Sequence, residues 1–360
     1  MEAEKQRVFY ADVLRVLAAF AVVVLHVAGD GWKNTAVGSM DWHIYNLYGS
    51  LVRWAVPIFV MLSGMFLLDP GKELGTGKIY RKYILRVLIA IVVWGLFYRC
   101  TDIAISRYIR HKDISRNAAI VELLEIPFGT AWFHLWYLYM IVGLYVMTPI
   151  YRVFTRTASQ KECRYLLAVF ALFGICLPLL KKGLICIHPR LELNLTVAET
   201  VNYTGYFFAG YCFSKASLSK RQKGIVYAVG ILSFFIMAVG TAFLSIRGGE
   251  NTEVLYENLS PVTMLETVMV FILVKSLCGR TSTGRPSATN TTRLISNISS
   301  CTFGIYLLHA FVLRVCIMAG VTKLFFSPWL SVPLVSLLIF SVSLSITYLL
   351  RKIPVCRWFM

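Results

Sequence analysis

Long apolar runs recur along the whole chain, separated by short polar segments. Each run approaches the roughly 20 residues that an α-helix needs to cross a bilayer. The pattern predicts an all-α, polytopic integral membrane protein with about ten transmembrane helices, forming one domain over residues 1–360. The predicted spans lie at 9–28, 47–68, 83–104, 135–154, 164–180, 201–214, 224–246, 259–278, 302–320 and 330–350.

The sixth predicted span is the weakest. Its sequence, NYTGYFFAGYCFS, is short and rich in Tyr and Gly. We therefore expect it to be tilted, broken or buried among the other helices.

Basic residues concentrate in alternate loops. The clusters are Lys5/Arg7, Lys72/Lys78/Arg81/Lys82, Arg152/Arg156/Lys161/Arg164, Lys215/Lys220/Arg221/Lys223, Lys275/Arg280/Arg285/Arg293 and Arg351/Lys352/Arg357. Because Lys and Arg collect on the cytoplasmic side of membrane proteins, we expect both termini to be cytoplasmic. The exception is the loop 105–133, where Arg107, Arg110, Lys112 and Arg116 would lie outside.

The formal net charge of +18 changes this picture little. Nucleic acid binding needs a coherent basic face, and here the charges are divided among six short segments. No nucleic acid partner is expected, and the surroundings are membrane lipids. The polar stretch 279–301 is interpreted as a mobile cytoplasmic linker.

The nine cysteines are scattered, without CxxC or paired spacing. Neither a metal site nor a disulfide framework is indicated. The first span has a charged start like that of a signal peptide, but it is long and has no clear cleavage site, so it is interpreted as retained.

Two ionisable residues lie inside the first span, Arg15 and His26. Such residues are expensive in a membrane and are usually functional. Eleven helical positions turn three times plus about 20° and rise about 16 Å, so both side chains share one face at different depths. The alternative is that Arg15 reaches the inner headgroups and His26 sits at the outer interface as boundary residues.

Several segments together resemble one family of proteins. They are Asp12 followed by Arg15-x10-His26, the run VPIFVMLSGMFLL, the basic start RKYILR, the stretch HLWYLYMIVGLY and the late TFGIYLLH ending at His309. In order and spacing they resemble the acyltransferase-3 family of integral membrane O-acyltransferases, over essentially the whole chain.

The resemblance implies an acyl-coenzyme A donor, typically acetyl-coenzyme A, on the cytoplasmic side. It also implies a cell-envelope acceptor, such as a cell-surface glycan or a lipid-linked sugar. Many relatives carry an additional extracytoplasmic SGNH esterase-like domain. None is present here, so we expect the membrane domain to act alone or with a separate extracytoplasmic acyl-transfer partner, as a multi-pass protein of a bacterial cytoplasmic membrane.

The side chains of the first span suit this chemistry. A histidine is the natural general base for a hydroxyl that attacks a thioester, which makes His26 the first choice. Arg15 would orient the donor or stabilise oxyanion charge, and Asp12 would hold the guanidinium or cap the span.

Coenzyme A carries several phosphates, which need cationic partners at the cytoplasmic mouth. Arg81, Lys82 and Arg86 are candidates, and only Lys82 and Arg86 share a helical face closely. The alternative is ordinary anchoring of the third span.

His309 is a second-rank candidate, expected at a depth similar to that of Arg15, and its alternative is a structural bond to a neighbouring helix. Ser63 is also ranked second. It is favoured as a small packing residue over a nucleophile, because no base can be assigned beside it.

His134, Trp136 and Tyr137 begin the fourth span, where aromatic residues form interfacial belts. A sugar ring also stacks on such residues, so this edge is the predicted acceptor entrance. Arg53 and Arg99, near the outer ends of spans two and three, would bind an anionic acceptor or anchor those ends.

Two other classes stay open. A carrier or flippase of glycan precursors would also bury Arg and His, although no inverted repeat is visible. In a membrane sensor or assembly subunit, Arg15 and His26 on their shared helical face would have a structural role.

Overall fold

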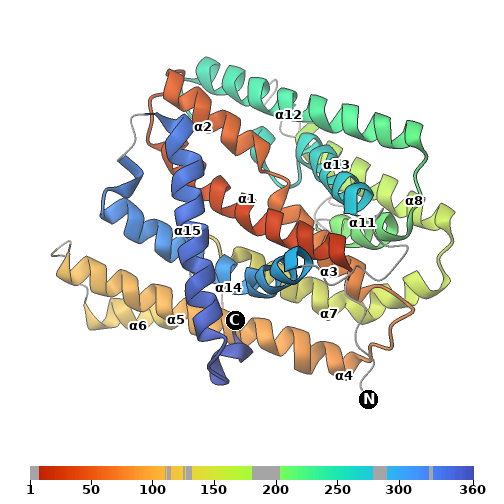
Figure 1. Ribbon diagram of the computed structural model, residues 1–360, viewed down its shortest axis with the longest axis horizontal. Helices are drawn as coiled ribbons and strands as arrows, with labels where there is room; N and C mark the ends of the chain where they lie inside the picture. The colour runs from red at the N-terminus through yellow and green to blue at the C-terminus, as the bar shows by residue number, and fades with distance from the viewer. Residues whose placement is uncertain are drawn as a thin grey trace.

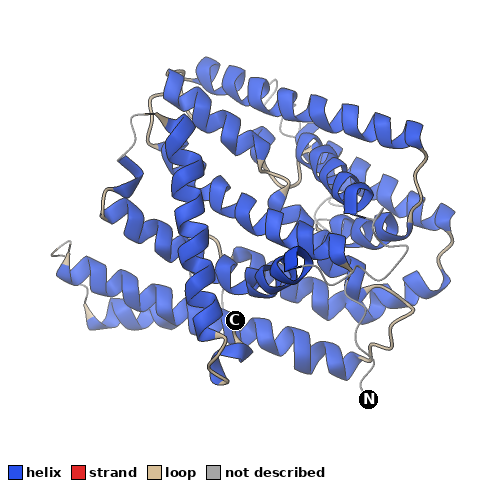
Figure 2. Cartoon of the chain, in the orientation of Figure 1, coloured by secondary structure: helices blue, strands red, loops and turns tan. Residues whose placement is uncertain are grey.

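The computed structural model describes residues 8–109, 111, 115–124, 126, 132–180, 203–278, 290–323 and 327–360. Within these ranges the chain forms helices and connecting turns, and no strand (Figure 2). Of the predicted basic clusters, Lys5, Arg7, Arg110, Lys112, Arg280 and Arg285 lie outside the described residues.

Figure 1 shows the order of the helices along the chain. The first half contains α1 (Phe9–Lys33), α2 (Met40–Leu51), α3 (Ala55–Leu67), α4 (Thr76–Lys78), the π-helical η1 (Ile79–Ile84), α5 (Leu85–Tyr108), α6 (Arg116–Leu124), α7 (Trp136–Thr157), α8 (Gln160–Val169) and the π-helical η3 (Phe170–Cys176). The second half contains α11 (Thr204–Lys215), α12 (Lys220–Gly248), η4 (Val254–Tyr256), α13 (Pro261–Cys278), α14 (Asn290–Met318), η6 (Val321–Lys323), α15 (Pro328–Leu350) and η7 (Val355–Trp358).

Nine helical stretches among the described residues are long and apolar enough to cross a membrane. The protein is therefore a polytopic, all-helical membrane protein, as predicted. The sixth predicted span is the difference: its helix, α11, has only 12 residues. It is nevertheless buried, because it packs along α3.

Helix α1 lies at the centre of the bundle and contacts α2, α3, α13, α14 and α15. In Figure 1 it runs across the middle, with α12 along one edge and α5 along the other. Apolar residues on α1 such as Leu14, Ala18 and Val23 are almost fully buried. These apolar side chains pack against the neighbouring helices and suit this central place.

Two glycines allow α3 and α11 to approach closely. A Cβ atom on Gly64 would lie 1.7 Å from the carbonyl oxygen of Phe207, and one on Gly210 would lie 1.8 Å from that of Met61. Small residues commonly mediate such contacts in membranes.

The second predicted span is broken. Helix α2 ends at Leu51 and α3 begins at Ala55, with a turn at 52–54 between them. Broken helices at membrane depth occur where the backbone is buried in protein or lines a cavity. This break carries Arg53.

The predicted linker 279–301 needs correction. Residues 279–289 lie outside the described residues, but α14 begins at Asn290, twelve residues before the predicted start of that span at residue 302. The polar residues of this first part of α14 face α1: Ser296 and Ser299 donate hydrogen bonds of 2.9 and 2.7 Å to Asp12.

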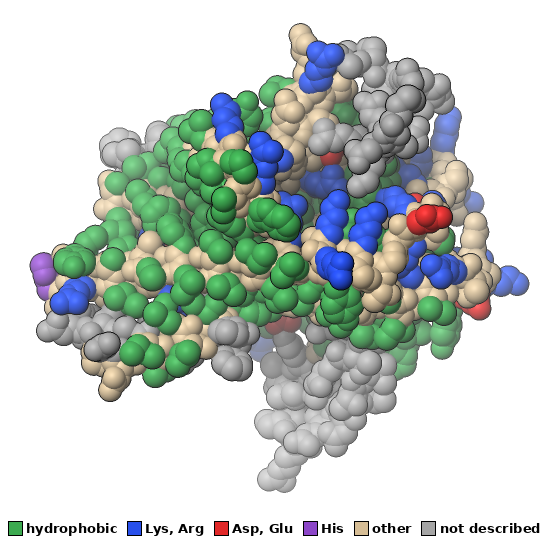
Figure 3. Space-filling model, turned by 90° about the horizontal axis from the view of Figure 1, so that it is seen from below, with side chains coloured by type: hydrophobic (Ala, Val, Ile, Leu, Met, Phe, Trp, Pro, Cys, Tyr) green, Lys and Arg blue, Asp and Glu red, His purple; other side chains and the backbone are tan. Residues whose placement is uncertain are grey.

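The outer surface is apolar where lipid would contact it. Helix α12 exposes Ile231, Phe235, Val239 and Phe243 along one side. In Figure 3 the hydrophobic side chains cover the left and centre of the face, and Lys and Arg gather mainly toward the right, the end at which α1 begins in Figure 1. This distribution fits the charge asymmetry of the loops.

Candidate active site

One large cavity follows α1 along its length. Its volume is about 2160 Å³. The α1 residues that line it include Asp12, Arg15, His26, Asp30 and Lys33. Arg15 and His26 therefore share the cavity-facing side of α1, about 16 Å apart along its axis by helical rise.

The cavity has two chemically distinct ends, joined by a middle section of mixed character. The end near Arg15 is lined by Tyr10, Asp69, Lys72, Lys78, Tyr83, Arg86 and Lys215. The middle is lined by Val22, Leu25, Phe59, Leu62, Ser63, Tyr137, Ile141, Tyr145, Phe303 and Tyr306. The end beyond His26 is lined by Arg53, Asp102, Trp132, Phe133, Glu253, Tyr256, Asn258 and Arg314.

His26 of α1 belongs to a cluster of three histidines, with His309 of α14 and His134 in the turn before α7. Its ring stacks on that of His309, with centroids 5.1 Å apart and planes inclined by 28°. His134 meets His309 edge to face at 5.2 Å. Since His26 is half-buried and lines the cavity whereas His309 is 1% exposed, His26 is the ring of the stacked pair that a substrate can reach.

His309 lies at the level of His26, and the predicted depth beside Arg15 is wrong. The reason is the early start of α14, which puts His309 almost twenty residues into its helix instead of seven. The sequence alone therefore did not predict that the imidazoles of His26 and His309 lie against each other.

The hydrogen bonds of His309 define its tautomer. Its Nδ1 lies 2.6 Å from the carbonyl oxygen of Tyr306 and 3.2 Å from that of Ile305. A carbonyl oxygen only accepts, so Nδ1 carries the hydrogen, and the Nε2 of the neutral ring keeps a free lone pair. This Nε2 is buried and makes no hydrogen bond to the described residues.

Asp12 holds Arg15 in place. Its carboxylate accepts hydrogen bonds from Arg15 at 2.8 Å, Ser296 at 2.9 Å and Ser299 at 2.7 Å, and it is 3% exposed. The Arg15 guanidinium also lies over the ring of Phe66, 4.8 Å from its centroid. With its lone pairs engaged by three donors, Asp12 is suited to positioning Arg15 and joining α1 to α14.

The three predicted donor-binding residues separate in the structure. Arg86 lines the cavity, its guanidinium lies 5.3 Å from the ring centroid of Phe303, and it donates to the carbonyl oxygen of Met360. Arg81 and Lys82 are exposed and do not line this cavity.

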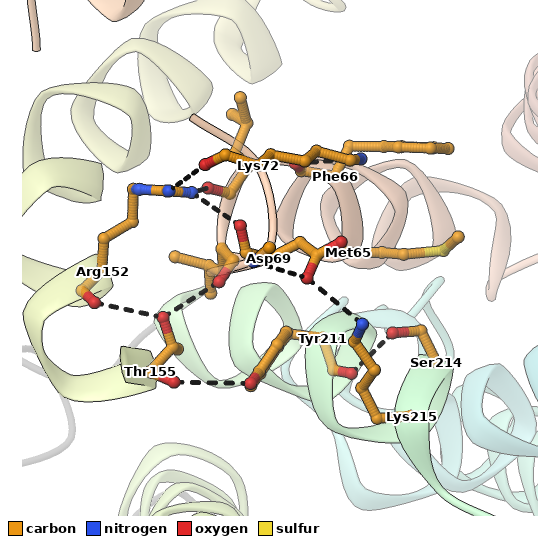
Figure 4. A network of polar contacts seen from close by, with 12 residues as sticks. Met65, Phe66, Asp69, Lys72, Arg152, Thr155, Tyr211, Ser214 and Lys215 are labelled. Carbon is orange, nitrogen blue, oxygen red and sulfur yellow. Dashed lines mark hydrogen bonds and ion pairs between the residues drawn. The ribbon is translucent and has the colours of Figure 1, made fainter. Parts of the chain in front are cut away.

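The loop after α3 carries Lys72 and is held by hydrogen bonds and an ion pair (Figure 4). Arg152 is buried and donates to the carbonyl oxygens of Leu67, Asp69 and Lys72 at 2.7, 3.0 and 2.6 Å. Lys215 forms an ion pair with Asp69 at 3.2 Å. Arg152 thus satisfies carbonyls at the carboxyl end of α3, where a cation also suits the helix dipole.

Ser63 is engaged in the structure. It donates to the carbonyl oxygen of Phe59 at 2.9 Å and lies 3.4 Å from the hydroxyl of Tyr145. Because its hydrogen is committed to the backbone, its oxygen is an acceptor for Tyr145. This geometry favours a structural role for Ser63 over a nucleophilic one.

The predicted acceptor residues mostly reach the cavity. His134, Trp136, Tyr137 and Arg53 line it, whereas Arg99 does not. His134 is 3% exposed, so it lies inside the bundle and not in an interfacial belt.

Sequence reasoning missed several cavity residues. It treated Lys72, Lys78 and Lys215 only as topological charges, and it overlooked Tyr145. It also overlooked Glu266, a 2% exposed carboxylate in α13. The argument that singled out Arg15 and His26, an ionisable residue inside a predicted span, would have found Glu266 too.

Within the described ranges, no three His, Cys, Asp or Glu side chains are grouped to hold a metal ion. Comparison with protein families gives one match: a model of the acyltransferase-3 family, described as an acyltransferase domain, fits residues 8–351. No curated protein and no solved structure matches the chain significantly.

Proposed function

Since the chain belongs to the acyltransferase-3 family, whose model spans nearly its full length, we propose that it transfers an acyl group, acetyl in particular, from cytoplasmic acyl-coenzyme A to a hydroxyl of a cell-envelope glycan or lipid-linked sugar. The observation that carries this proposal is the single cavity that passes both Arg15 and His26. A donor and an acceptor entering from opposite ends would meet within it.

The end near Arg15 suits the donor. Lys72, Lys78, Arg86 and Lys215 line it together with Arg15, and such cations bind phosphates well. This is also the end at which α1 begins and toward which Lys and Arg gather on the face shown in Figure 3, which supports a cytoplasmic location.

The distance between Arg15 and His26 supports different roles for the two residues. About 16 Å of helix separates them, so they cannot both contact the same atom of a bound substrate. A nucleotide held near Arg15 would extend its long pantetheine arm through the middle of the cavity and present the thioester beside His26.

His26 is placed to act as the general base. In the proposed step, the acceptor hydroxyl loses its proton to the imidazole as its oxygen attacks the thioester carbonyl carbon. The tetrahedral intermediate then collapses, the carbon–sulfur bond breaks, and the imidazolium returns the proton to the departing thiolate. The products are an O-acyl ester and free coenzyme A.

The end beyond His26 suits a sugar. Trp132, Phe133, Trp136 and Tyr256 line it with carboxylates and asparagine between them. Sugars pack their apolar faces on aromatic rings and use such polar groups for their hydroxyls.

Oriented vesicles test the proposal. Radiolabelled acetyl-coenzyme A is supplied to the cytoplasmic face only, and envelope glycan is confined to the other face. We expect labelled glycan with the wild-type protein and none above background with His26→Ala. The matched control is His43→Ala, because His43 lies on α2 and does not line the cavity.

The outcomes separate the classes of function. Glycan that crosses the membrane without label would indicate a carrier. Label that appears only when both substrates share the cytoplasmic face would refute transfer across the membrane. Normal transfer by correctly inserted His26→Ala would refute the role of His26.

A further inference from the structure

Arg53 is the cation of the outer half of the cavity that the proposed mechanism has not used. It lies in the turn between α2 and α3 and lines the cavity together with Val56 of the first turn of α3. The first turn of a helix carries the positive end of the helix dipole, and in α3 it does so although Ala55 N–H is bonded to the carbonyl oxygen of Val52. The break in the second span therefore brings two sources of positive potential to one place.

Tyr256 holds the Arg53 side chain. The guanidinium carbon lies 3.7 Å from the centroid of the tyrosine ring, and a guanidinium nitrogen lies 3.4 Å from its carbonyl oxygen. The tyrosine hydroxyl in turn contacts the carbonyl oxygen of Asn46 at 2.8 Å and the hydroxyl of Ser50 at 3.2 Å. Arg53 thus rests on a platform that is itself bonded to α2.

Arg53 differs from the other cations at this end because it has no ion pair with a described residue. Lys33 pairs with Glu253 at 2.9 Å, and Arg314 pairs with Asp102 at 2.5 Å. Arg53 has Glu266 within electrostatic range, but that carboxylate is 2% exposed and one of its oxygens has no hydrogen bond among the described residues. Glu266 therefore forms no ion pair with Arg53 and leaves its donors unoccupied.

Arg53 also acts on the same place as His26. Both line the cavity, and Tyr256, on which Arg53 rests, packs on Trp32 of α1 with ring centroids 5.4 Å apart, six residues beyond His26. Arg15 is about 16 Å away along α1 and cannot reach an atom bound there. Lys33 is already paired with Glu253.

We propose that Arg53, supported by the first turn of α3, stabilises the negatively charged oxygen of the tetrahedral intermediate that forms beside His26. The inference rests on the proposed function, since it assumes attack on a thioester at that position. When the hydroxyl oxygen bonds to the carbonyl carbon, the carbonyl electron pair moves to oxygen, and the guanidinium faces that charge. Collapse returns the pair to the carbonyl as the carbon–sulfur bond breaks, so Arg53 gains and loses no proton.

A binding experiment tests this without turnover. S-carboxymethyl-coenzyme A has anionic oxygens near the position of the thioester carbonyl, and S-propyl-coenzyme A replaces this carboxylate by an uncharged group of similar size. We expect purified wild-type protein to prefer the carboxymethyl ligand, and Arg53→Gln to reduce that preference about ten- to hundredfold, the range for a hydrogen bond to a charged group. Arg53→Lys keeps a charge but not the planar fork, so we expect an intermediate value.

Arg247→Gln is the matched control, because Arg247 lies at the exposed end of α12 and does not line the cavity. It should keep the wild-type preference. Thermal unfolding measurements check that each variant is folded. If Arg53→Gln is not folded, Arg53→Lys replaces it in the binding experiment.

Turnover adds a second readout. We expect kcat for acyl transfer to fall about a hundred- to thousandfold in Arg53→Gln, as when one oxyanion donor is removed, with little change in affinity for S-propyl-coenzyme A.

Three results would each contradict a different part of the proposal. No binding of either ligand by wild type contradicts the proposed function. Equal ligand preference in wild type and Arg53→Gln contradicts the oxyanion role. A rise only in KM for the acceptor would make Arg53 an anchor for an acceptor anion instead.

Discussion

The imidazole of His309 stacks on that of His26, with centroids 5.1 Å apart and planes inclined by 28°. The backbone fixes the orientation of His309, because its Nδ1 is 2.6 Å from the carbonyl oxygen of Tyr306. The face of a neutral ring thus lies against the ring proposed to gain a proton. An aromatic face stabilises such a cation.

This stack predicts a graded response to substitution of His309. His309→Ala should lower kcat about tenfold, since a cation–π contact is worth roughly 0.5 to 2 kcal/mol. His309→Phe keeps a flat ring and should retain most of the activity. Steady-state kinetics over a range of pH, with thermal unfolding as the control, checks this. If His309→Phe were as slow as His309→Ala, the ring nitrogens would be required, and wild-type rates in both would show that the stack does not matter.

Asp12→Ala should destabilise the protein and loosen Arg15. The substitution removes the acceptor of Arg15, Ser296 and Ser299 at once. Breaking a buried ion pair costs about 3–5 kcal/mol when the partner charge stays buried, and Arg15 keeps partial exposure, so we expect about 2 kcal/mol. Unfolding in detergent measures this, with Asp41→Ala, at an exposed position in the first turn of α2, as the control. Equal stability of the two variants would contradict the role of Asp12.

Arg86→Gln should weaken coenzyme A binding more at low salt than at high salt, because exposed charges are screened by ions. Arg86 lines the cavity and Arg81 does not, so Arg81→Gln should cost less. Titration calorimetry at two ionic strengths checks both, and Arg221→Gln at the start of α12 controls for net charge. Equal losses in the Arg81 and Arg86 variants would mean that the cavity lining does not identify the donor site.

Gly64→Ala should disrupt the contact of α3 with α11. Its new methyl group would lie 1.7 Å from the carbonyl oxygen of Phe207, so the backbones must separate. Overpacking costs about 1–3 kcal/mol, sometimes more. Gly143→Ala is the matched control, since nothing lies within 4 Å of its Cβ position. The unfolding temperatures of both variants test this prediction. An unchanged unfolding temperature for Gly64→Ala would show that α11 can move away from α3 without cost.

The helical, membrane-spanning fold could be predicted because hydrocarbon imposes length and apolarity on each span. The shared face of Arg15 and His26 followed from helical geometry alone. Both arguments depend only on positions near one another in the chain.

The predictions that were wrong concerned features that depend on contacts between segments distant in the sequence. The segment 290–301 is polar enough to look like a linker, but its serines satisfy Asp12, so α14 starts early. That shift brings His309 to His26. The break that exposes Arg53 to the cavity depends likewise on Tyr256, some two hundred residues away. No local pattern contains these pairings.

The separation of Arg15 from His26 also bears on the electric field across the membrane. Coenzyme A held near Arg15 keeps its negative charges on one side, whereas moving each charge across 100 mV would cost about 2.3 kcal/mol. The acyl group that passes between the two residues is uncharged. The proton released by the acceptor passes through His26 to the thiolate at the same place, so the exchange of the acyl group for a proton on sulfur moves no net charge across the membrane. Acyl transfer should therefore proceed in energised membranes at a rate that does not depend on the voltage.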